Sequence, residues 1–167
     1  MKSYQIFLAS SLNEFKDERN EIGDFIRRIQ DILIDYHIRL KLFECEFYDN
    51  SVASLRKQEE YNEEIKRSQI FLMLVGKTVG MYTLEEYHVA QSYKVPYIYV
   101  LLQKKEHDNS ITLLKDNMNK GEICYEFETY FDMKQYIAKM IQRCLKESVE
   151  IQVDENKIWI ETQYVSF

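Results

Sequence analysis

Segments with two different patterns of hydrophobic residues alternate along the chain. Short apolar runs rich in β-branched and aromatic residues predict strands, and apolar residues that return every three or four positions predict amphipathic helices. The run 70–75 is entirely apolar, which predicts a central strand buried on both faces. The predicted strands cover residues 4–9, 38–43, 69–75, 97–102 and 123–127. The predicted helices cover residues 15–33, 55–67, 83–93, 110–117 and 131–145.

Strands that alternate with helices predict a parallel sheet with helices on both faces. We therefore expect an α/β fold, a flavodoxin-like three-layer sandwich whose central, mostly parallel sheet is five-stranded. Ligands bind such sheets beyond the carboxyl ends of the strands, near the point where the strand order reverses. The loops expected to carry a site are therefore residues 9–11, 44–54 and 76–82.

The C-terminal tail departs from this alternation. Residues 151–153 and 157–162 have strand-forming sequences on either side of Asp154-Glu155-Asn156, and this pattern predicts a hairpin. The hairpin is either an addition to the edge of the sheet or the beginning of a further domain. We accordingly divide the chain into a first domain, residues 1–148, and a C-terminal hairpin or domain start, residues 149–167.

Composition narrows the classes of function. The chain has 167 residues, which fits one domain, and its formal net charge of -6 makes nucleic acid an unfavourable partner. Its longest apolar runs, 70–75 and 97–102, are too short to span a membrane. The three cysteines are odd in number and far apart, so they suit neither a disulfide framework nor a metal site. We expect a cytoplasmic protein with reduced thiols, no bound metal and no membrane contact.

Two common nucleotide-binding motifs are absent from the sequence. The first predicted strand runs into Ala9-Ser10-Ser11 and not into the glycine-rich turn of dehydrogenases. Gly76-Lys77-Thr78 lacks the preceding glycine of a Walker loop at the required spacing, and it does not follow the first strand. His88 lies two positions from Glu86 on the same predicted helix, so the two side chains do not face each other. A histidine-based mechanism is therefore not expected.

Three segments near the expected site have a distinctive pattern. Residues 6–11 run from an apolar strand into small hydroxyl residues, and residues 64–68 lead through a helix end and a serine into the strand 70–75. Tyr82 stands four positions before Glu86, after which apolar residues follow. These segments, which span roughly the first hundred residues, resemble Toll/interleukin-1 receptor (TIR) domains. Residues 10–19 resemble a bacterial group of TIR-like domains that are fused to larger defence proteins. Tyr82 replaces the family's usual Trp, and the loop after the second strand lacks a Gly found in many relatives.

The resemblance implies an NAD+ glycohydrolase, which breaks the bond between nicotinamide and ribose with NAD+ as substrate and no cofactor. The transition state resembles an oxocarbenium ion, so a carboxylate beside the ribose stabilises the developing positive charge. The resemblance assigns that carboxylate to Glu86. It also implies an effector domain of bacterial antiphage immunity, activated by self-association and controlled by a sensor domain or partner protein. Hydrolysis and formation of cyclic ADP-ribose both remain open.

The central candidate residues each have a structural alternative. Glu86 ends the pattern Thr83-Leu84-Glu85-Glu86, which also fits a capping box at a helix start. Ser10 and Ser11 lie where the first strand meets a helix, a place that suits contact with NAD+ phosphates or ribose. The alternative is that Ser11 caps that helix, with Glu14 three residues later.

The outer candidate residues complete the predicted substrate site. Tyr82 either stacks on nicotinamide or ribose, or packs within its loop. Glu44 ends the second strand and is a candidate to bind a ribose hydroxyl. Arg56 and Lys57 either face the diphosphate or are solvated. Glu85 is the second candidate for the catalytic carboxylate, with solvation as its alternative.

Two other functions fit the same fold, because a fold does not determine a function. One is a non-catalytic TIR-like adaptor that assembles through its surface and does not need Glu86. The other is an enzyme similar to nucleoside deoxyribosyltransferases, in which a glutamate is the nucleophile. Dependence of catalysis on Glu86 would exclude the adaptor, and a covalent sugar trapped on Glu86 would favour the transferase.

Overall fold

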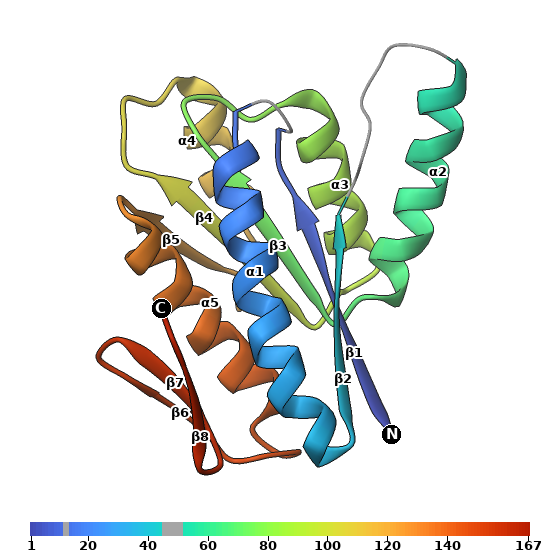
Figure 1. Ribbon diagram of the computed structural model, residues 1–167. Helices are drawn as coiled ribbons and strands as arrows, with labels where there is room; N and C mark the ends of the chain where they lie inside the picture. The colour runs from blue at the N-terminus through green and yellow to red at the C-terminus, as the bar shows by residue number, and fades with distance from the viewer. Residues whose placement is uncertain (12–13, 45–51) are drawn as a thin grey trace.

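The chain forms alternating strands and helices followed by a small C-terminal sheet (Figure 1). The computed structural model describes residues 1–11, 14–44 and 52–167, without the side chains of residues 52–56. The first half consists of β1 (Lys2–Ala9), α1 (Lys16–Leu33), the 3-10 turn η1 (Ile34–Tyr36), β2 (Ile38–Glu44), α2 (Val52–Arg67) and β3 (Ile70–Val75). The second half consists of α3 (Met81–Ser92), β4 (Tyr97–Gln103), α4 (Asn109–Asp116), β5 (Ile123–Phe127), α5 (Tyr130–Leu145), β6 (Ile151–Asp154), β7 (Lys157–Ile160) and β8 (Gln163–Ser166).

Strands β1 to β5 form one parallel sheet in the order β2-β1-β3-β4-β5. This order confirms the predicted flavodoxin-like α/β fold. The order reverses between β1 and β3, which pair from Ile6 with Ile70 to Ala9 with Met73. Because the strands are parallel, their carboxyl ends meet at one edge, which is uppermost in Figure 1. The switch point of the sheet therefore lies at this edge, between β1 and β3.

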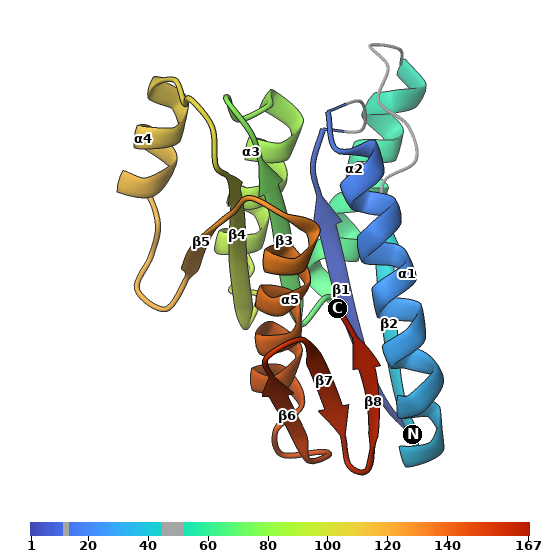
Figure 2. The same cartoon turned by 60° about the vertical axis from the view of Figure 1, so that its left-hand side comes forward.

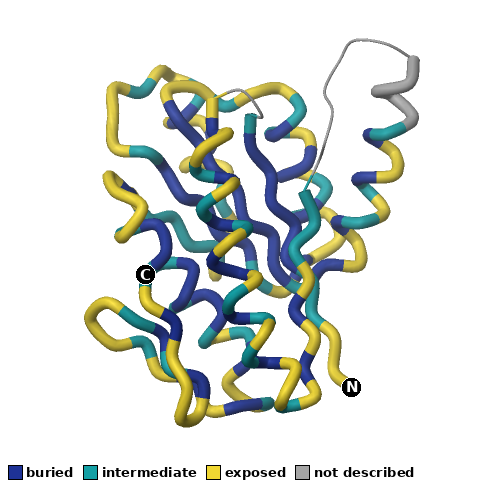
Figure 3. The backbone as a smooth tube through the Cα atoms, in the orientation of Figure 1, coloured by how far each residue is buried: buried dark blue, intermediate teal, exposed yellow. Residues whose placement is uncertain are grey.

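Alternate strand residues face opposite sides of the sheet and build two hydrophobic layers. Ile6 and Leu8 of β1 pack with α1 and α5 on one side, and Phe7 packs with α2, α3 and α4 on the other. Figure 2 shows α1 and α5 on one side of the sheet, with α2 and α3 on the opposite side. All six residues of β3 are buried, which confirms the predicted central strand (Figure 3).

The helix α1 begins later than the predicted cap at Ser11. The helix begins at Lys16, and Phe15 occupies the cap position without a side-chain cap. The Ser11 hydroxyl accepts a hydrogen bond from the Glu14 amide at 3.4 Å, as the capping box predicts, but in the turn before the helix. The Phe15 side chain is 1% exposed and packs in the core.

Other helix starts also differ from the prediction. α2 begins at Val52, inside the segment predicted as loop 44–54. α5 has a capping box that the sequence interpretation missed, at Thr129 and Asp132. The Thr129 hydroxyl accepts from the Asp132 amide at 3.1 Å, and the Asp132 carboxylate accepts from the Thr129 amide at 3.3 Å. Aspartate replaces the usual glutamate of such boxes, yet it satisfies the same backbone groups.

The C-terminal residues form an antiparallel sheet in the order β6-β7-β8. The predicted hairpin is present as β6 and β7, and β8 is an additional strand. In the described chain these strands do not pair with β1–β5, so the first of the two alternatives, an addition to the edge of the central sheet, is wrong. The reason is that their apolar side chains join the core layer of α1 and α5. These side chains belong to Ile151, Ile158, Ile160 and Val165.

The last residue fixes this small sheet to the helices. The Phe167 ring packs edge-on against Phe25 of α1, with ring centroids 5.8 Å apart. It also packs edge-on against Phe131 of α5 at 5.6 Å. The small sheet therefore shares its hydrophobic core with the larger one.

Candidate functional site

Arg19, in the first turn of α1, joins the carboxyl ends of β1 and β2. Its Nη1 donates a hydrogen bond to the Ser10 hydroxyl at 2.8 Å, and its Nη2 lies 3.6 Å from Glu44 Oε1. The Arg19 side chain is 8% exposed and Ser10 is buried, whereas the Glu44 side chain is 37% exposed. The structure thus joins two predicted site residues through a third residue that the sequence interpretation missed.

The sequence pattern that predicted α1 also indicates that Arg19 is buried. Phe15 precedes it by four positions and Ile22 follows it by three, so all three side chains share the buried face of the helix. Arginine is almost never fully buried unless it is paired. A charged residue inside an otherwise apolar helical stripe therefore indicates a polar contact within the fold.

Glu86 is completely buried on the inner face of α3. Thr83, Tyr87 and Ala90 lie on the same face, at the three- and four-residue spacing of a helix. α3 contacts β1, β3 and α2, so this helix packs over the switch point of the sheet. The structure therefore places the predicted catalytic carboxylate inside the protein, behind the edge at which Ser10 lies.

The start of α3 tests the interpretation of Glu86 as part of a capping box. Gly80 is extended and occupies the cap position, and the helix begins at Met81 without a side-chain cap. Thr83 is therefore inside the helix, and Glu86 is three residues beyond it. The interpretation of Thr83 and Glu86 as a capping box is wrong, because Gly80 starts the helix before Thr83 is reached. A helix cap does not explain the burial of this carboxylate.

A cluster of polar side chains, which begins at the residue after Glu86, attaches α3 to a neighbouring segment. The Tyr87 hydroxyl donates a hydrogen bond to Glu122 Oε1, and Gln91 Nε2 donates to Glu122 Oε2 at 3.1 Å. Gln91 Nε2 also donates to the Asn117 carbonyl at 3.1 Å. Burial, together with the Glu122 carboxylate, raises the pKa of the Tyr87 hydroxyl above its ordinary value. Two successive turns of α3 are thereby attached to the segment between α4 and β5.

The remaining predicted site residues are spread around the carboxyl edge. Tyr82 is half-buried near the start of α3, and Ser11 is half-buried beyond β1. Glu85 is exposed on α3, as expected for a solvated carboxylate. The backbone of Arg56 lies in α2, but its side chain falls outside the described residues, as does the loop 45–51.

Residues from three connections meet beyond the carboxyl end of β3. Gly76 follows β3 directly, and a Cβ atom placed on it would lie 1.8 Å from Glu14 Oε1. The Glu14 carboxylate therefore occupies the space that a side chain at position 76 would need. Lys105, which follows β4, has its Nζ 3.7 Å from the same Glu14 oxygen. A carboxylate from the β1–α1 connection thus stands beside the ends of β3 and β4.

Comparison with known proteins places the chain in a family. A family model described as a domain of unknown function, DUF4062, matches residues 5–142, from β1 into α5. The chain belongs to the DUF4062 family. No curated protein matches it. Within this DUF4062 domain, the matched range includes the residues from Ser10 to Lys105 discussed above and excludes β6–β8. The family description states no activity, so the resemblance to TIR domains stays a prediction.

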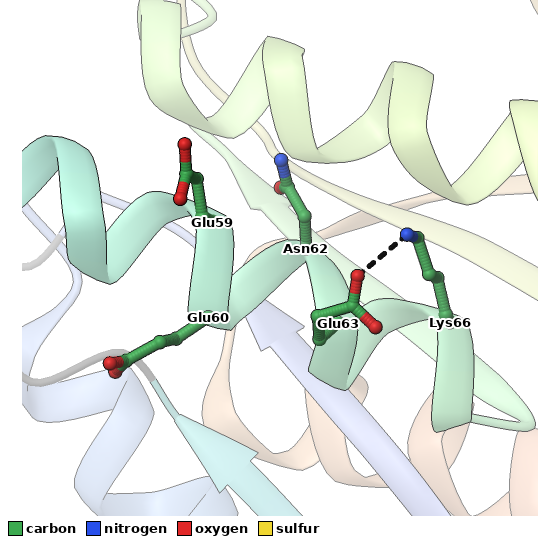
Figure 4. Close-up of a pocket in the computed structure, with 5 residues that line it drawn as sticks. All are labelled: Glu59, Glu60, Asn62, Glu63 and Lys66. Atoms are coloured by element: carbon green, nitrogen blue, oxygen red, sulfur yellow. Dashed lines mark hydrogen bonds and ion pairs between the residues drawn. The ribbon is translucent and has the colours of Figure 1, made fainter.

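One hollow of the DUF4062 domain, about 670 Å³ in volume, lies along α2. Five side chains of that helix line it (Figure 4). Glu63 accepts a hydrogen bond from Lys66 Nζ at 2.7 Å, which lowers the pKa of the Glu63 carboxyl. Exposed ion pairs between successive helical turns contribute little free energy. We interpret this hollow as a solvated helix surface, because neither Glu86 nor Ser10 lines it. Its lining consists of Glu59, Glu60, Asn62, Glu63 and Lys66.

A second hollow, about 450 Å³ in volume, lies on the outer face of α3. Its apolar lining includes Met81 and Tyr93, which are 74% and 54% exposed. The Lys66 ammonium lies 4.4 Å from the centre of the Tyr93 ring, so this hollow adjoins the one on α2. α3 thus has apolar side chains on its outer face as well as its inner face.

Neither a metal-binding cluster nor a membrane-spanning helix is found in the part of the chain that the structure describes. In residues 1–11, 14–44 and 52–167, no three histidine, cysteine or acidic side chains are placed to hold a metal ion. No helix in the same ranges is long and apolar enough to cross a membrane. Burial raises the pKa of the Cys144 thiol to about 11, and it also raises the pKa of Cys124. Burial therefore favours the protonated form of both thiols.

Proposed function

We propose that this DUF4062 domain is an NAD+ glycohydrolase in which Glu86 is the catalytic carboxylate. The observation that carries the proposal is the complete burial of Glu86 on α3, over the switch point of the sheet. A helix that only packs against a sheet does not require a carboxylate on its inner face, and enclosing one costs free energy. Ionisable groups in such surroundings concentrate at functional sites.

The chemistry suits one carboxylate. The bond between C1 of the ribose and the nicotinamide nitrogen breaks, and both bonding electrons leave with neutral nicotinamide. Positive charge develops on the ribose, where a nearby carboxylate stabilises it, most strongly in a site that excludes water. In hydrolysis a water oxygen then bonds to C1 and releases a proton. Cyclisation instead uses a nitrogen of the adenine as the nucleophile.

The carboxyl edge supplies groups for the rest of the dinucleotide. In this proposal Ser10 and Ser11 contact the phosphates or a ribose, and Glu44 accepts from a ribose hydroxyl. Arg19 orients Ser10 and Glu44 through the two contacts described above. Tyr82 stacks on the nicotinamide or ribose, and Arg56 is kept as a candidate partner of the diphosphate.

Activation in this proposal requires a rearrangement, because Glu86 is 0% exposed and a substrate does not reach it in the present arrangement. We attribute the rearrangement to self-association. The exposed apolar side chains of Met81 and Tyr93 on the outer face of α3 support this idea, since contiguous apolar surface marks interaction sites. A contact there would act on the same helix that carries Glu86.

The resemblance to bacterial TIR-like domains supports a cellular setting. In it the domain is a cytoplasmic effector of antiphage immunity that depletes NAD+, and a sensor domain or partner protein controls its assembly. The experiment that tests the enzymatic proposal is nicotinamide release from NAD+ by concentrated protein. Glu86→Gln is expected to abolish release, and Glu85→Gln, the same change on the exposed neighbouring position, is expected to retain it.

A non-catalytic assembly module is the second candidate, and the apolar outer face of α3 is the observation that favours it. Such a module would self-associate equally well with Glu86→Gln and would release no nicotinamide at any concentration. Sedimentation velocity on the wild type and this variant, run beside the nicotinamide assay, separates the two candidates.

A further inference from the structure

The carboxylate of Glu14 stands where a ligand of this fold would bind. In open parallel sheets, ligands lie beyond the carboxyl ends of the strands at the switch point. Gly76 is the first residue beyond β3 and has no side chain, and Glu14 Oε1 fills the space beside it. From this juxtaposition we propose that the space beside Gly76 is an anion site for the diphosphate of a dinucleotide, and that Glu14 fills it as an internal substitute. The dinucleotide as ligand rests on the proposed function.

The groups around Gly76 suit an anion that can be exchanged. Lys105 Nζ lies 3.7 Å from Glu14 Oε1, so the present occupant is paired with a cation from the end of β4. The Glu14 and Lys105 side chains are 34% and 41% exposed, so solvent reaches both. An exposed pair of this kind is weak. A diphosphate, which carries more charge than a carboxylate, competes for the same ammonium group.

The backbone beside the site is held in place independently of Glu14. The Val79 amide donates to the Ser110 hydroxyl at 3.0 Å, and the Asp108 amide donates to the Lys77 carbonyl at 3.0 Å. The Asp108 carboxylate in turn accepts from the Ser110 amide at 2.9 Å. These bonds join the β3–α3 connection to the start of α4. Displacement of Glu14 therefore leaves the Gly76 backbone in position for a ligand.

The proposal assigns opposite effects to the two members of the pair. Glu14 repels an incoming anion and fills its place, so its removal improves binding. Lys105 attracts the anion, so its removal weakens binding. Gly76 provides the space, and a methyl group there both expels the Glu14 carboxylate and fills the site. Substitution Gly76→Ala therefore weakens binding although it displaces the competitor.

Isothermal titration with inorganic pyrophosphate and, separately, with ADP-ribose tests this site without requiring catalysis. Glu14→Gln is expected to tighten binding of both probes about fivefold, the effect of one charge at about 4 Å in water. Lys105→Gln is expected to weaken binding by a similar factor, and Gly76→Ala to weaken it as well. The matched control is Glu128→Gln, because Glu128 pairs with the neighbouring Lys104 at 3.8 Å and has no glycine beside it. Circular dichroism verifies that each variant is folded.

Binding that tightens only in Glu14→Gln and weakens in Lys105→Gln supports the site. Equal responses of Glu14→Gln and Glu128→Gln, or no binding of either probe to any variant, overturn it. Binding of ADP-ribose without pyrophosphate would also overturn a site that recognises the diphosphate. Nicotinamide release, measured separately, decides the proposed enzyme activity. The anion site therefore stands or fails independently of that activity.

Discussion

The Ser10 hydroxyl accepts a hydrogen bond from the Arg19 guanidinium at 2.8 Å, inside the protein. Ser10 follows β1 and Arg19 lies in the first turn of α1, so this bond fixes the connection at the switch point. A hydrogen bond to a charged group contributes more than one between neutral groups, so removal of the Ser10 hydroxyl takes away a strong contact of the guanidinium.

Ser10→Ala is expected to lower the free energy of unfolding by about 2 kcal/mol. The matched control is Ser11→Ala, because the Ser11 hydroxyl makes a contact of 3.4 Å and is more exposed. Urea unfolding monitored by circular dichroism measures both variants. Equal effects of the two substitutions would show that the Arg19 contact does not stabilise the fold.

Tyr87 is expected to make stability depend on alkaline pH. Burial and the Glu122 carboxylate raise the pKa of Tyr87 above 10.0, so the folded chain favours the protonated hydroxyl. The stabilisation is complete below the unfolded pKa of about 10, and it is lost as the pH rises above that value. The wild type should therefore lose stability more steeply than Tyr87→Phe between about pH 9.5 and pH 11. Tyr164→Phe, at an exposed position, is the control; parallel stability curves for the wild type and Tyr87→Phe would refute the assignment.

The capping box of α5 offers a local test of helix stability. Thr129→Ala removes the hydroxyl that accepts from the Asp132 amide, and a loss of about 1 kcal/mol in the free energy of unfolding is expected. Thr129→Ser keeps the hydroxyl and should restore most of the loss. Thermal or urea unfolding of the two variants decides the matter, and equal stability of all three proteins would contradict it.

The small C-terminal sheet is expected to unfold together with the central one. Trp159 is the single tryptophan and lies in β7, so its fluorescence reports the small sheet, whereas far-ultraviolet circular dichroism is dominated by the helices. The shared core of Ile158 and Ile160 with α1 and α5 predicts coincident urea transitions. Ile158→Ala should shift both transitions by the same amount. Two separate transitions would indicate that residues 149–167 form an independent unit.

The sequence predicted the fold well because the signals for it are local. The apolar runs of β3 and β4 and the periodic stripes of α1 and α5 are each readable within a short window, and their alternation implies the parallel sheet. β8 was missed because Val165 is its only buried side chain, so no apolar run or clear alternation marks these four residues. Its pairing and the packing of the small sheet on α1 and α5 depend on contacts between distant parts of the chain.

The site could be predicted only in part, because its contacts join residues that are distant in sequence. Ser10, Glu44 and Glu86 were selected by their places at strand ends or in a family-like motif. Arg19 was not selected, because it lies within the apolar stripe of a predicted helix and because Ser10 and Glu44, which it contacts, lie outside that helix. Glu14 follows β1 and Gly76 follows β3, so their contact joins two connections that are distant in sequence. No local pattern indicates this contact. The helix start at Met81 was missed because Gly80, and not a polar side chain, occupies the cap position.

The measurement that tests the central claim most directly is nicotinamide release from NAD+ by the folded wild type over a series of rising protein concentrations. Glu86→Gln and Glu85→Gln are measured in parallel, with circular dichroism to verify their folds. We predict release that rises more than proportionally with wild-type concentration, persists in Glu85→Gln and is absent in Glu86→Gln. Release that is absent at every concentration, or that persists in Glu86→Gln, would contradict the assignment of Glu86 as the catalytic carboxylate of an NAD+ glycohydrolase.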